Sequence, residues 1–208
     1  MLSKKLPYWN KAIKHLKEND KILAKIINSN HKEYMIINDN YFINLIKAII
    51  GQQISVKAAQ SIWIKFSKKY KNISPKKISN EKISNLKKVG LSKQKALYIK
   101  NISIFFIKNK KKIKNWPFIK DQIIIEDLTS IKGIGTWTAE MFLMFSLGRA
   151  NIFPIQDLGL LKAISKNYNK KLPITPFFLK KLKNRWSPWC TVATWYLWKS
   201  IDPVDVSY

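Results

Sequence analysis

Residues 128–157 read LTSIKGIGTWTAEMFLMFSLGRANIFPIQD, and this stretch decides the fold of the chain. Two apolar segments with helical spacing flank the turn Gly133-Ile134-Gly135, which predicts a helix, a tight hairpin and a second helix opening at Thr136. Glycines allow positive φ angles and let a phosphate approach the backbone N–H groups, while the second helix presents its positive end. Such a unit can hold a phosphate backbone without reading sequence. An ordinary turn between two helices would show the same residues.

A single carboxylate, Asp157, ends this stretch. It is the only acidic residue between Glu140 and Asp202, so this region offers no second acid. Asp157 also stands where the N-cap of the helix LGLLKAIS is expected, and a capping role and a chemical role are compatible. The helix dipole stabilises negative charge at that position, which suits an electrostatic role better than that of a general acid.

Helix signals dominate the rest of the chain. Polar residues precede apolar segments of helical period, some with proline at the first helical position; the predicted starts are Asp20, Ser55, Ser92, Ser74-Pro75, Thr175-Pro176 and Ser187-Pro188. The lysine run 108–114 is expected to be a solvated link. Because sustained alternation of period two is hard to find, the predicted fold class is all-α.

Composition and charge narrow the classes of function. The 208 residues carry a formal net charge of +27, which suits a polyanionic partner such as nucleic acid. Only Arg149 and Arg185 are arginines, so a drift toward A/T-rich codons would produce the same lysine excess without selection for binding. The charge is therefore compatible with nucleic-acid binding but does not identify it.

Few side chains are available for disulfides or metal sites. With Cys190 as the only cysteine, disulfides within the chain, four-cysteine zinc sites and cysteine-ligated iron–sulfur clusters are excluded. His15 and His31 stand apart from any metal-ligand grouping. The basic N-terminus lacks a continuous apolar region, and no apolar run reaches the roughly 18 residues of a membrane span. We expect a soluble protein of the cytoplasm, associated with the nucleoid.

Several separate motifs, in order, resemble those of one known family. The segments LIKAIIGQQISVKAA (45–59), VGLSKQKALYI (89–99), GIGTWTAEMFLMFSLG (133–148), IFPIQDLGL (152–160) and RWSPWCTVATWYLW (185–198) are similar to the helix–hairpin–helix base-excision DNA glycosylases. The branch they resemble most is DNA-3-methyladenine glycosylase II. The likeness covers most of the chain from about Tyr41 onward.

The resemblance implies a single glycosylase domain, 1–208, in which two helical halves flank a cleft. About 41–147 would form the central half, which ends in the helix–hairpin–helix, and 1–40 with 148–208 would form the second half. The 40 residues before the first motif are too few and too helical for the N-terminal β-domain that some relatives carry. A monomer is expected.

The resemblance assigns the catalytic role to Asp157. Cleaving an N-glycosidic bond builds positive charge on the sugar, which an oriented carboxylate stabilises, and the same group can orient or deprotonate the attacking water. An alkylated purine such as 3-methyladenine already carries positive charge and leaves readily. One acid can then suffice, where ordinary glycosidases use two.

The resemblance also assigns the base pocket. Trp137 and Trp198 match positions whose rings would hold a flipped cationic base, although core packing is the alternative for each tryptophan. Met141 matches a position that is tyrosine in well-known bacterial members, which leaves the details of base selectivity open. Strand-cutting relatives carry a lysine nucleophile where this chain has Trp137, and Lys132 does not match that position. A monofunctional enzyme without lyase activity follows.

DNA contacts are expected at two turns. Gln52 and Gln53 follow an apolar helix, and Gln53 matches the wedge that fills the gap left by the extruded base; a solvated turn is the alternative. The hairpin residues expected to contact the phosphate backbone are Gly133, Ile134, Gly135 and Thr136. The backbone carbonyls of Thr129, Ile131 and Gly133 match those that hold a monovalent cation, Na⁺ or K⁺, in family hairpins. No cofactor is expected to be required.

The sequence thus predicts a monofunctional DNA glycosylase of base excision repair. Its partner would be double-stranded DNA containing damaged bases, from which it would flip alkylated purines and hydrolyse the glycosidic bond. Two alternatives stay open: a helix–hairpin–helix glycosylase for an oxidised or mismatched base, and a DNA-binding protein without enzymatic activity.

Overall fold

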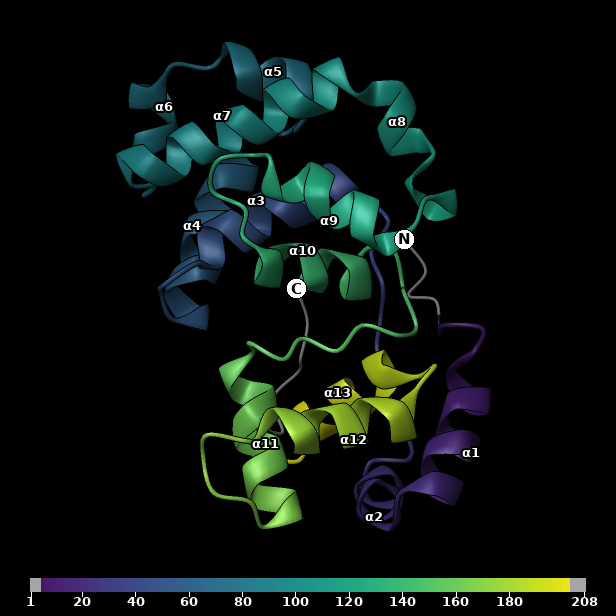
Figure 1. The fold of residues 1–208 in the computed structure, drawn as a ribbon. Helices are drawn as coiled ribbons and strands as arrows, with labels where there is room; N and C mark the ends of the chain where they lie inside the picture. Colours follow the sequence, from purple (N-terminus) through teal and green to yellow (C-terminus); the bar gives the residue numbers. More distant parts are fainter. Residues whose placement is uncertain (1–4, 203–208) are drawn as a thin grey trace. The chain divides into compact units, whose positions relative to one another are not determined.

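The computed structural model describes residues 5–202, whose regular structure is almost wholly helical (Figure 1). The helices are α1 Trp9–Asn19, α2 Lys21–Ser29, α3 Tyr41–Gly51, α4 Val56–Lys69, α5 Pro75–Asn80, α6 Ile83–Lys87, α7 Lys93–Lys108, α8 Lys110–Lys114, η1 Trp116–Phe118, α9 Asp121–Thr129, α10 Thr136–Phe145, α11 Leu158–Tyr168, α12 Pro176–Trp186 and α13 Cys190–Lys199. Strand-type pairing in this part of the chain is limited to an isolated bridge between Lys5 and Ile36. The all-α prediction is confirmed. Of the described helices, none is long and apolar enough to cross a membrane.

The chain divides into two compact units, and it crosses between them once after Asn38 and once inside α10. Among the described residues, unit 1 takes in those up to Asn38 together with those from Leu143 onward, and unit 2 runs from Asp39 to Phe142. The glycine hairpin therefore belongs to unit 2, and Asp157 belongs to unit 1.

Unit 1 is built around α13, all ten residues of which are buried. A helix that is apolar on nearly every side must be covered on every side. In unit 1 α13 packs against α1, α2, α11 and α12. Trp195, Tyr196 and Trp198 provide much of its bulk, so the side chains of α13 are held on a rigid support.

A buried carboxylate, Asp20, forms the N-cap of α2 in unit 1. Its Oδ1 accepts hydrogen bonds from the backbone N–H groups of Ile22 and Leu23, at 3.0 and 3.1 Å. The cap predicted from the sequence is thus present. It satisfies two of the N–H groups that a helix start leaves without partners.

The second oxygen of Asp20 connects α2 to two more helices. Its Oδ2 accepts hydrogen bonds from the Tyr168 hydroxyl at 2.7 Å, the Trp186 indole at 2.9 Å and the Arg185 guanidinium at 3.3 Å. Burial by itself would raise the pKa of Asp20, but the hydrogen bonds, led by that from Trp186, outweigh it and hold the pKa below its usual value. Because Tyr168 is the last residue of α11, this network fixes the end of α11 opposite Asp157.

Unit 2 is arranged around α7, which packs against α3, α5, α6 and α8. Phe42 of α3 and Phe106 of α7 belong to an aromatic cluster with Trp116 of η1 and Phe142 of α10. Neighbouring ring centroids in this cluster are 5.2–5.9 Å apart. Such edge-to-face and tilted pairs add to the burial of apolar surface. The packing gives α7 a fixed position within unit 2.

Most of the predicted helix starts are confirmed, and one is wrong. Asp20, Ser55, Ser74, Ser92, Asp157 and Thr175 each accept a hydrogen bond from the backbone of the helix that follows. Ser187 instead donates to the Lys183 carbonyl, 2.8 Å away, at the end of α12, and α13 begins only at Cys190. A hydroxyl group can cap either end of a helix, so the Ser-Pro pair alone did not decide between them.

The lysine run 108–114 also differs from expectation. Its lysines are exposed as expected, but residues 110–114 form the short helix α8 rather than an irregular link. Ile113 is buried and anchors the segment, while Lys112 Nζ pairs with Asp127 Oδ1 at 2.5 Å. Ile113, the one buried residue of this helix, therefore packs a lysine-rich segment against the rest of unit 2.

Candidate catalytic carboxylate and nucleic-acid contacts

The hairpin predicted from the sequence connects α9 to α10 in unit 2. Gly133 has a φ of +108°, and a Cβ added there would lie 2.2 Å from the ring of Tyr98 on α7. Both the backbone conformation and this close approach require glycine. The Ile134 N–H donates to the Ile131 carbonyl at 3.0 Å and closes the turn.

The start of α10 leaves its backbone accessible. Gly135 and Thr136 are exposed, and apart from Gly135 and its two chain neighbours no described residue comes within 4 Å of a Cβ added at Gly135. The first N–H groups of a helix have no partners within the helix, and its dipole favours an anion there. Ile134 is buried, so its side chain anchors the turn. The geometry can receive a phosphate oxygen at the backbone of residues 135–136.

The turn between α3 and α4 is joined to this hairpin. The side-chain amide of Gln52 donates a hydrogen bond from Nε2 to the Gly133 carbonyl oxygen at 3.1 Å. The next residue, Gln53, is exposed and has a φ of +57°. Within unit 2 the structure thus brings together the two turns that were predicted separately as DNA contacts.

In unit 1, Asp157 is held by two hydrogen bonds to the same oxygen. Its Oδ1 accepts from the Leu160 backbone N–H at 2.6 Å, as the N-cap of α11, and from the Trp198 indole N–H at 2.8 Å. Trp198 is 7% exposed and stacks on Phe145, with ring centroids 6.2 Å apart and planes at 15°. The carboxylate is half-buried. Its position is therefore fixed by both a helix start and a core tryptophan.

Gly159 makes room for the contact between Trp198 and Asp157. A Cβ at residue 159 would meet Asp157 Oδ1 at 3.1 Å and Trp198 Cδ1 and Nε1 at 3.4 Å. Glycine within a helix costs about 1 kcal/mol relative to alanine, so its presence in the first turn of α11 has to be explained by packing. The sequence carried this signal, a glycine two residues after the cap, but not the identity of the side chain that packs against it.

Trp137 and Met141 lie one helical turn apart on α10, on the same face. Trp137 is half-buried and Met141 is buried, at 2% exposed. They belong to unit 2, whereas Trp198 belongs to unit 1. Their assignment to a base pocket stays a prediction.

The three carbonyls predicted to hold a monovalent cation are all in or beside the hairpin. The Ile131 carbonyl accepts from the Ile134 N–H, and the Gly133 carbonyl accepts from Gln52. A carbonyl oxygen has two lone pairs, so both oxygens can still bind a cation, and Thr129 at the end of α9 would supply a third. In residues 5–202 no group of three or more His, Cys, Asp or Glu side chains could hold a metal ion. The cation prediction thus rests on backbone oxygens alone.

Two residues of α7 that the sequence did not single out support these turns. Tyr98 packs its ring against Gly133, and Lys95 donates from Nζ to the carbonyls of Ile50 at 2.8 Å and Gln52 at 2.7 Å. Burial lowers the pKa of Lys95. One lysine among 37 carries no signal of such a role in the sequence.

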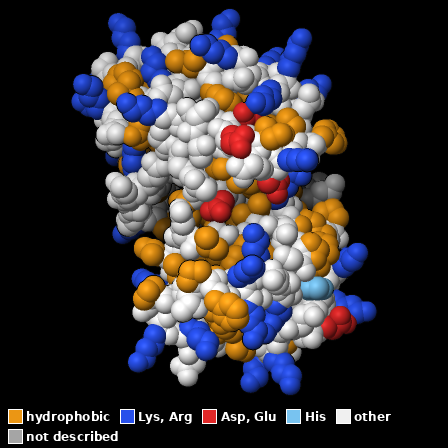
Figure 2. Space-filling view, viewed as in Figure 1, with side chains coloured by type: hydrophobic (Ala, Val, Ile, Leu, Met, Phe, Trp, Pro, Cys, Tyr) orange, Lys and Arg blue, Asp and Glu red, His pale blue; other side chains and the backbone are white. Residues whose placement is uncertain are grey.

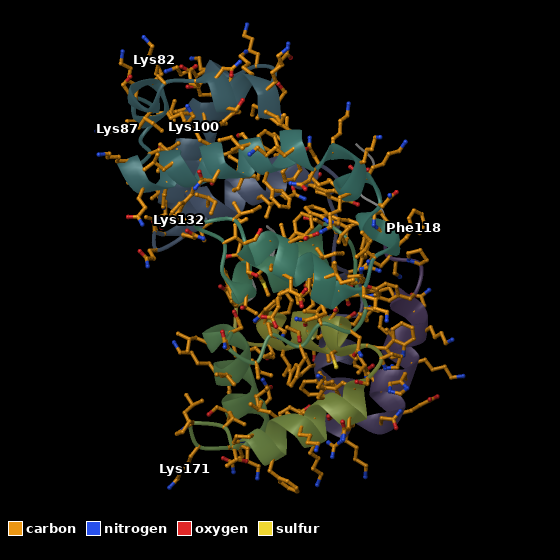
Figure 3. The ribbon with its side chains drawn as sticks, turned by 45° about the horizontal axis from the view of Figure 1, so that its top comes forward. Lys82, Lys87, Lys100, Phe118, Lys132 and Lys171 are labelled. Carbon is orange, nitrogen blue, oxygen red and sulfur yellow. The ribbon has the colours of Figure 1, made fainter. Side chains whose placement is uncertain are left out.

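Lysines are spread over the visible surface rather than gathered in one patch (Figure 2). Lys132, in the hairpin, is exposed. Figure 3 places it apart from Lys82, Lys87 and Lys100, which lie near one another in unit 2. A charge spread in this way favours polyanions in general, so the assignment of DNA contacts to the hairpin and to the Gln52–Gln53 turn stays a prediction.

The chain matches a family model over residues 46–187, described as HhH-GPD superfamily base excision DNA repair protein. It is 34% identical over 192 residues to the DNA-3-methyladenine glycosylase of Saccharomyces cerevisiae, covering 84% of this chain and 65% of that protein. This chain thus spans just under two thirds of the length of that relative. DNA-3-methyladenine glycosylase 1 of Schizosaccharomyces pombe is 32% identical over 196 residues, 91% of this chain and 85% of the relative.

The fold of this chain is also similar to that of a solved structure. The 3-methyladenine DNA glycosylase Mag1 of Schizosaccharomyces pombe, in complex with abasic DNA, superimposes with a TM-score of 0.74 at 29% identity. The match covers 91% of this chain and 96% of that one. The resemblance drawn from the sequence motifs is confirmed at the level of family and fold.

Proposed function

The chain belongs to the HhH-GPD superfamily of base excision DNA repair proteins, and on that basis we propose that it is a monofunctional DNA glycosylase acting on alkylated purines. Its partner would be double-stranded DNA that contains damaged bases. The names of the relatives, DNA-3-methyladenine glycosylases of two yeasts, support the choice of lesion. The observation that carries the proposal is the Asp157 carboxylate, held at the start of α11 by Leu160 and Trp198.

Asp157 would act on the sugar of the flipped nucleotide. As the glycosidic bond breaks, positive charge develops on the sugar ring, and a carboxylate fixed beside it stabilises that charge more than it stabilises the ground state. The same group can receive a proton from the attacking water. An alkylated purine leaves as a neutral base, so no second acid is needed at the leaving group.

The hairpin and the Gln52–Gln53 turn would hold the DNA. The exposed backbone at Gly135 and Thr136 would bind a phosphate, and the Gln53 side chain would fill the space vacated by the base. Carbonyl oxygens of Thr129, Ile131 and Gly133 would bind a monovalent cation, which would bridge to the same phosphate. These contacts fix the strand without reading its sequence, as lesion search requires.

Trp137 supports base removal without strand cleavage. It stands where strand-cutting relatives carry the lysine that attacks the sugar, and an indole cannot form a Schiff base. Trp137 and Trp198 would offer aromatic faces to a cationic base, with Met141 beside Trp137. The assignment predicts hydrolysis that ends at the abasic site.

A panel of duplexes with single defined lesions tests the proposal. The purified protein should release 3-methyladenine-type bases, and borohydride should trap no covalent protein–DNA adduct. A borohydride-dependent adduct would refute the monofunctional assignment. Release of only oxidised or mismatched bases would assign another lesion, and DNA binding with no release of any base would leave a non-enzymatic binding protein.

Replacing Trp198 with phenylalanine should slow base release by roughly tenfold or more, as expected when a hydrogen bond to a charged group is lost. Phenylalanine keeps an aromatic ring beside Phe145 but has no N–H to donate to Asp157. Single-turnover release from alkylated DNA is the measurement. If Trp198 served only to stack on the base, the phenylalanine variant would stay close to wild type.

Trp195→Phe is the matched control for this change. Trp195 lies on the same helix, is 3% exposed, and its Nε1 has no hydrogen-bond partner among the described residues. The Trp195→Phe variant therefore loses a similar side-chain volume from α13 but keeps the hydrogen bond between Trp198 and Asp157. Equal losses in the two variants would show that packing of α13, rather than the hydrogen bond, explains the effect.

A further inference from the structure

The turn that presents Gln53 is strained. Gln52 has φ −56° and ψ 128°, and Gln53 has a φ of +57°. These three angles are close to those of a type II turn over residues 51–54, whose third position normally takes glycine because a side chain is unfavourable there. A glutamine at that position with an exposed side chain indicates that the side chain itself is needed.

The backbone of this turn does little to hold that conformation. The hydrogen bond from the Ile54 N–H to the Gly51 carbonyl is 3.5 Å long, and that from Gln52 N–H to the Ile49 carbonyl is 3.4 Å. Both exceed the usual range for N–H···O bonds. A strained turn with weak internal bonds needs support from elsewhere in the fold.

Lys95 provides this support from α7. Its ammonium donates to the Ile50 carbonyl at 2.8 Å and to the Gln52 carbonyl at 2.7 Å, one on each side of the last residue of α3. The last carbonyls of a helix lack partners within it, and a cation is favoured at that end by the helix dipole. These two bonds are the shortest that reach the turn.

The same helix also fixes the hairpin. Tyr98, one turn after Lys95, packs against Gly133, and Gln52 bridges from the turn to the Gly133 carbonyl. Three segments of unit 2 are thus in mutual contact: the first two turns of α7, the Gln52–Gln53 turn and the hairpin. A change in any one of them would be transmitted to the others.

We propose that Lys95 is a positioning residue, which holds the Gln52–Gln53 turn in the conformation that presents the Gln53 side chain to DNA. This inference rests on the proposed function, in which Gln53 fills the space left by the extruded base. Lys95 itself acts on the protein backbone, not on a DNA phosphate.

Hydrogen exchange in the free protein tests the support directly. In Lys95→Met the backbone N–H groups of Gln52 and Ile54, which donate to the carbonyls of Ile49 and Gly51, should exchange about tenfold faster or more, because two charge-assisted bonds are lost. Lys100→Met is the matched control, since Lys100 lies on the same helix and donates to the Glu81 carbonyl at 2.7 Å, away from the hairpin (Figure 3). Unchanged exchange in Lys95→Met, or equal acceleration in the control, would overturn the proposal.

A double-mutant cycle tests whether Lys95 acts through Gln53. Lys95→Met and Gln53→Ala should each slow single-turnover base release by about tenfold, and the double variant should be no slower than either. Losses that multiply to about a hundredfold would mean that Lys95 acts independently, for example on a phosphate. Release by Gln53→Ala at the wild-type rate would remove the wedge role that Lys95 is proposed to serve.

These measurements separate this inference from the proposed function. If wild-type protein released no base from alkylated DNA, the glycosylase assignment would fail, but the exchange experiment would still decide whether Lys95 holds the turn. If wild type were active and the cycle were additive, the glycosylase assignment would stand and the positioning role would fall.

Discussion

Replacing Asp157 with asparagine is expected to reduce the single-turnover rate of base release by at least about a hundredfold, the loss typical when one electrostatic stabiliser of a transition state is removed. Asparagine has nearly the same shape and remains a good N-cap. Its side-chain oxygen can still accept from the Leu160 and Trp198 N–H groups that hold the wild-type carboxylate. The substitution therefore removes the charge and leaves the local fold in place.

Binding measurements separate loss of chemistry from loss of affinity. The asparagine variant should bind duplex DNA at least as tightly as wild type, because a negative charge near the phosphates is removed. Its thermal unfolding temperature should be close to that of wild type, because asparagine keeps the N-cap of α11. An asparagine variant that released alkylated bases at the wild-type rate would show that Asp157 is a cap alone.

Replacing Asp20 with alanine is expected to lower the free energy of unfolding by about 3–5 kcal/mol, the usual cost of removing one partner from a buried charged network. The change leaves the donors of Tyr168 and Trp186 buried and the Arg185 bond unmade. It also removes the cap of α2. Urea unfolding followed by tryptophan fluorescence measures the loss.

Glu18→Ala is the control for net charge. Glu18 is exposed and lies two residues before Asp20, so its removal changes the charge of the chain equally without touching the network. We expect a change within about 0.5 kcal/mol for this variant. A similar loss of stability in both variants would mean that the added positive charge, and not the network, explains the effect.

The same network predicts how stability depends on pH. The pKa of Asp20 is lower in the folded than in the unfolded chain, so its contribution is complete above the unfolded value of about 3.9 and is lost as the pH falls through the folded value. The gap in unfolding free energy between wild type and Asp20→Asn should therefore shrink below about pH 4. A gap that stayed constant down to pH 2 would contradict the assigned shift.

Much of the local structure follows from the sequence because caps and turns are short-range devices. Polar side chains at Asp20, Ser55, Ser92 and Asp157 each satisfy an N–H group two or three residues ahead, whatever the rest of the chain does. The positive φ of the hairpin likewise falls at Gly133, a residue type that adopts such angles without steric cost. Ser187 shows the limit of such signals, because its hydroxyl caps the helix before it rather than the helix after it.

The sequence by itself determined the all-helical class, the glycine hairpin, the family and the N-cap position of Asp157, the carboxylate to which we assign the glycosidic chemistry. Each of those features depends on residues close together in the sequence, or on the order in which several motifs follow one another along the chain. Only the tertiary structure decided what holds the chemical groups in place: Trp198 on Asp157, separated by 41 residues, and Lys95 on the Gln52 carbonyl, separated by 43. Contacts between residues so far apart depend on how helices pack, and no local pattern of residues records which of many tryptophans or lysines will reach a given atom.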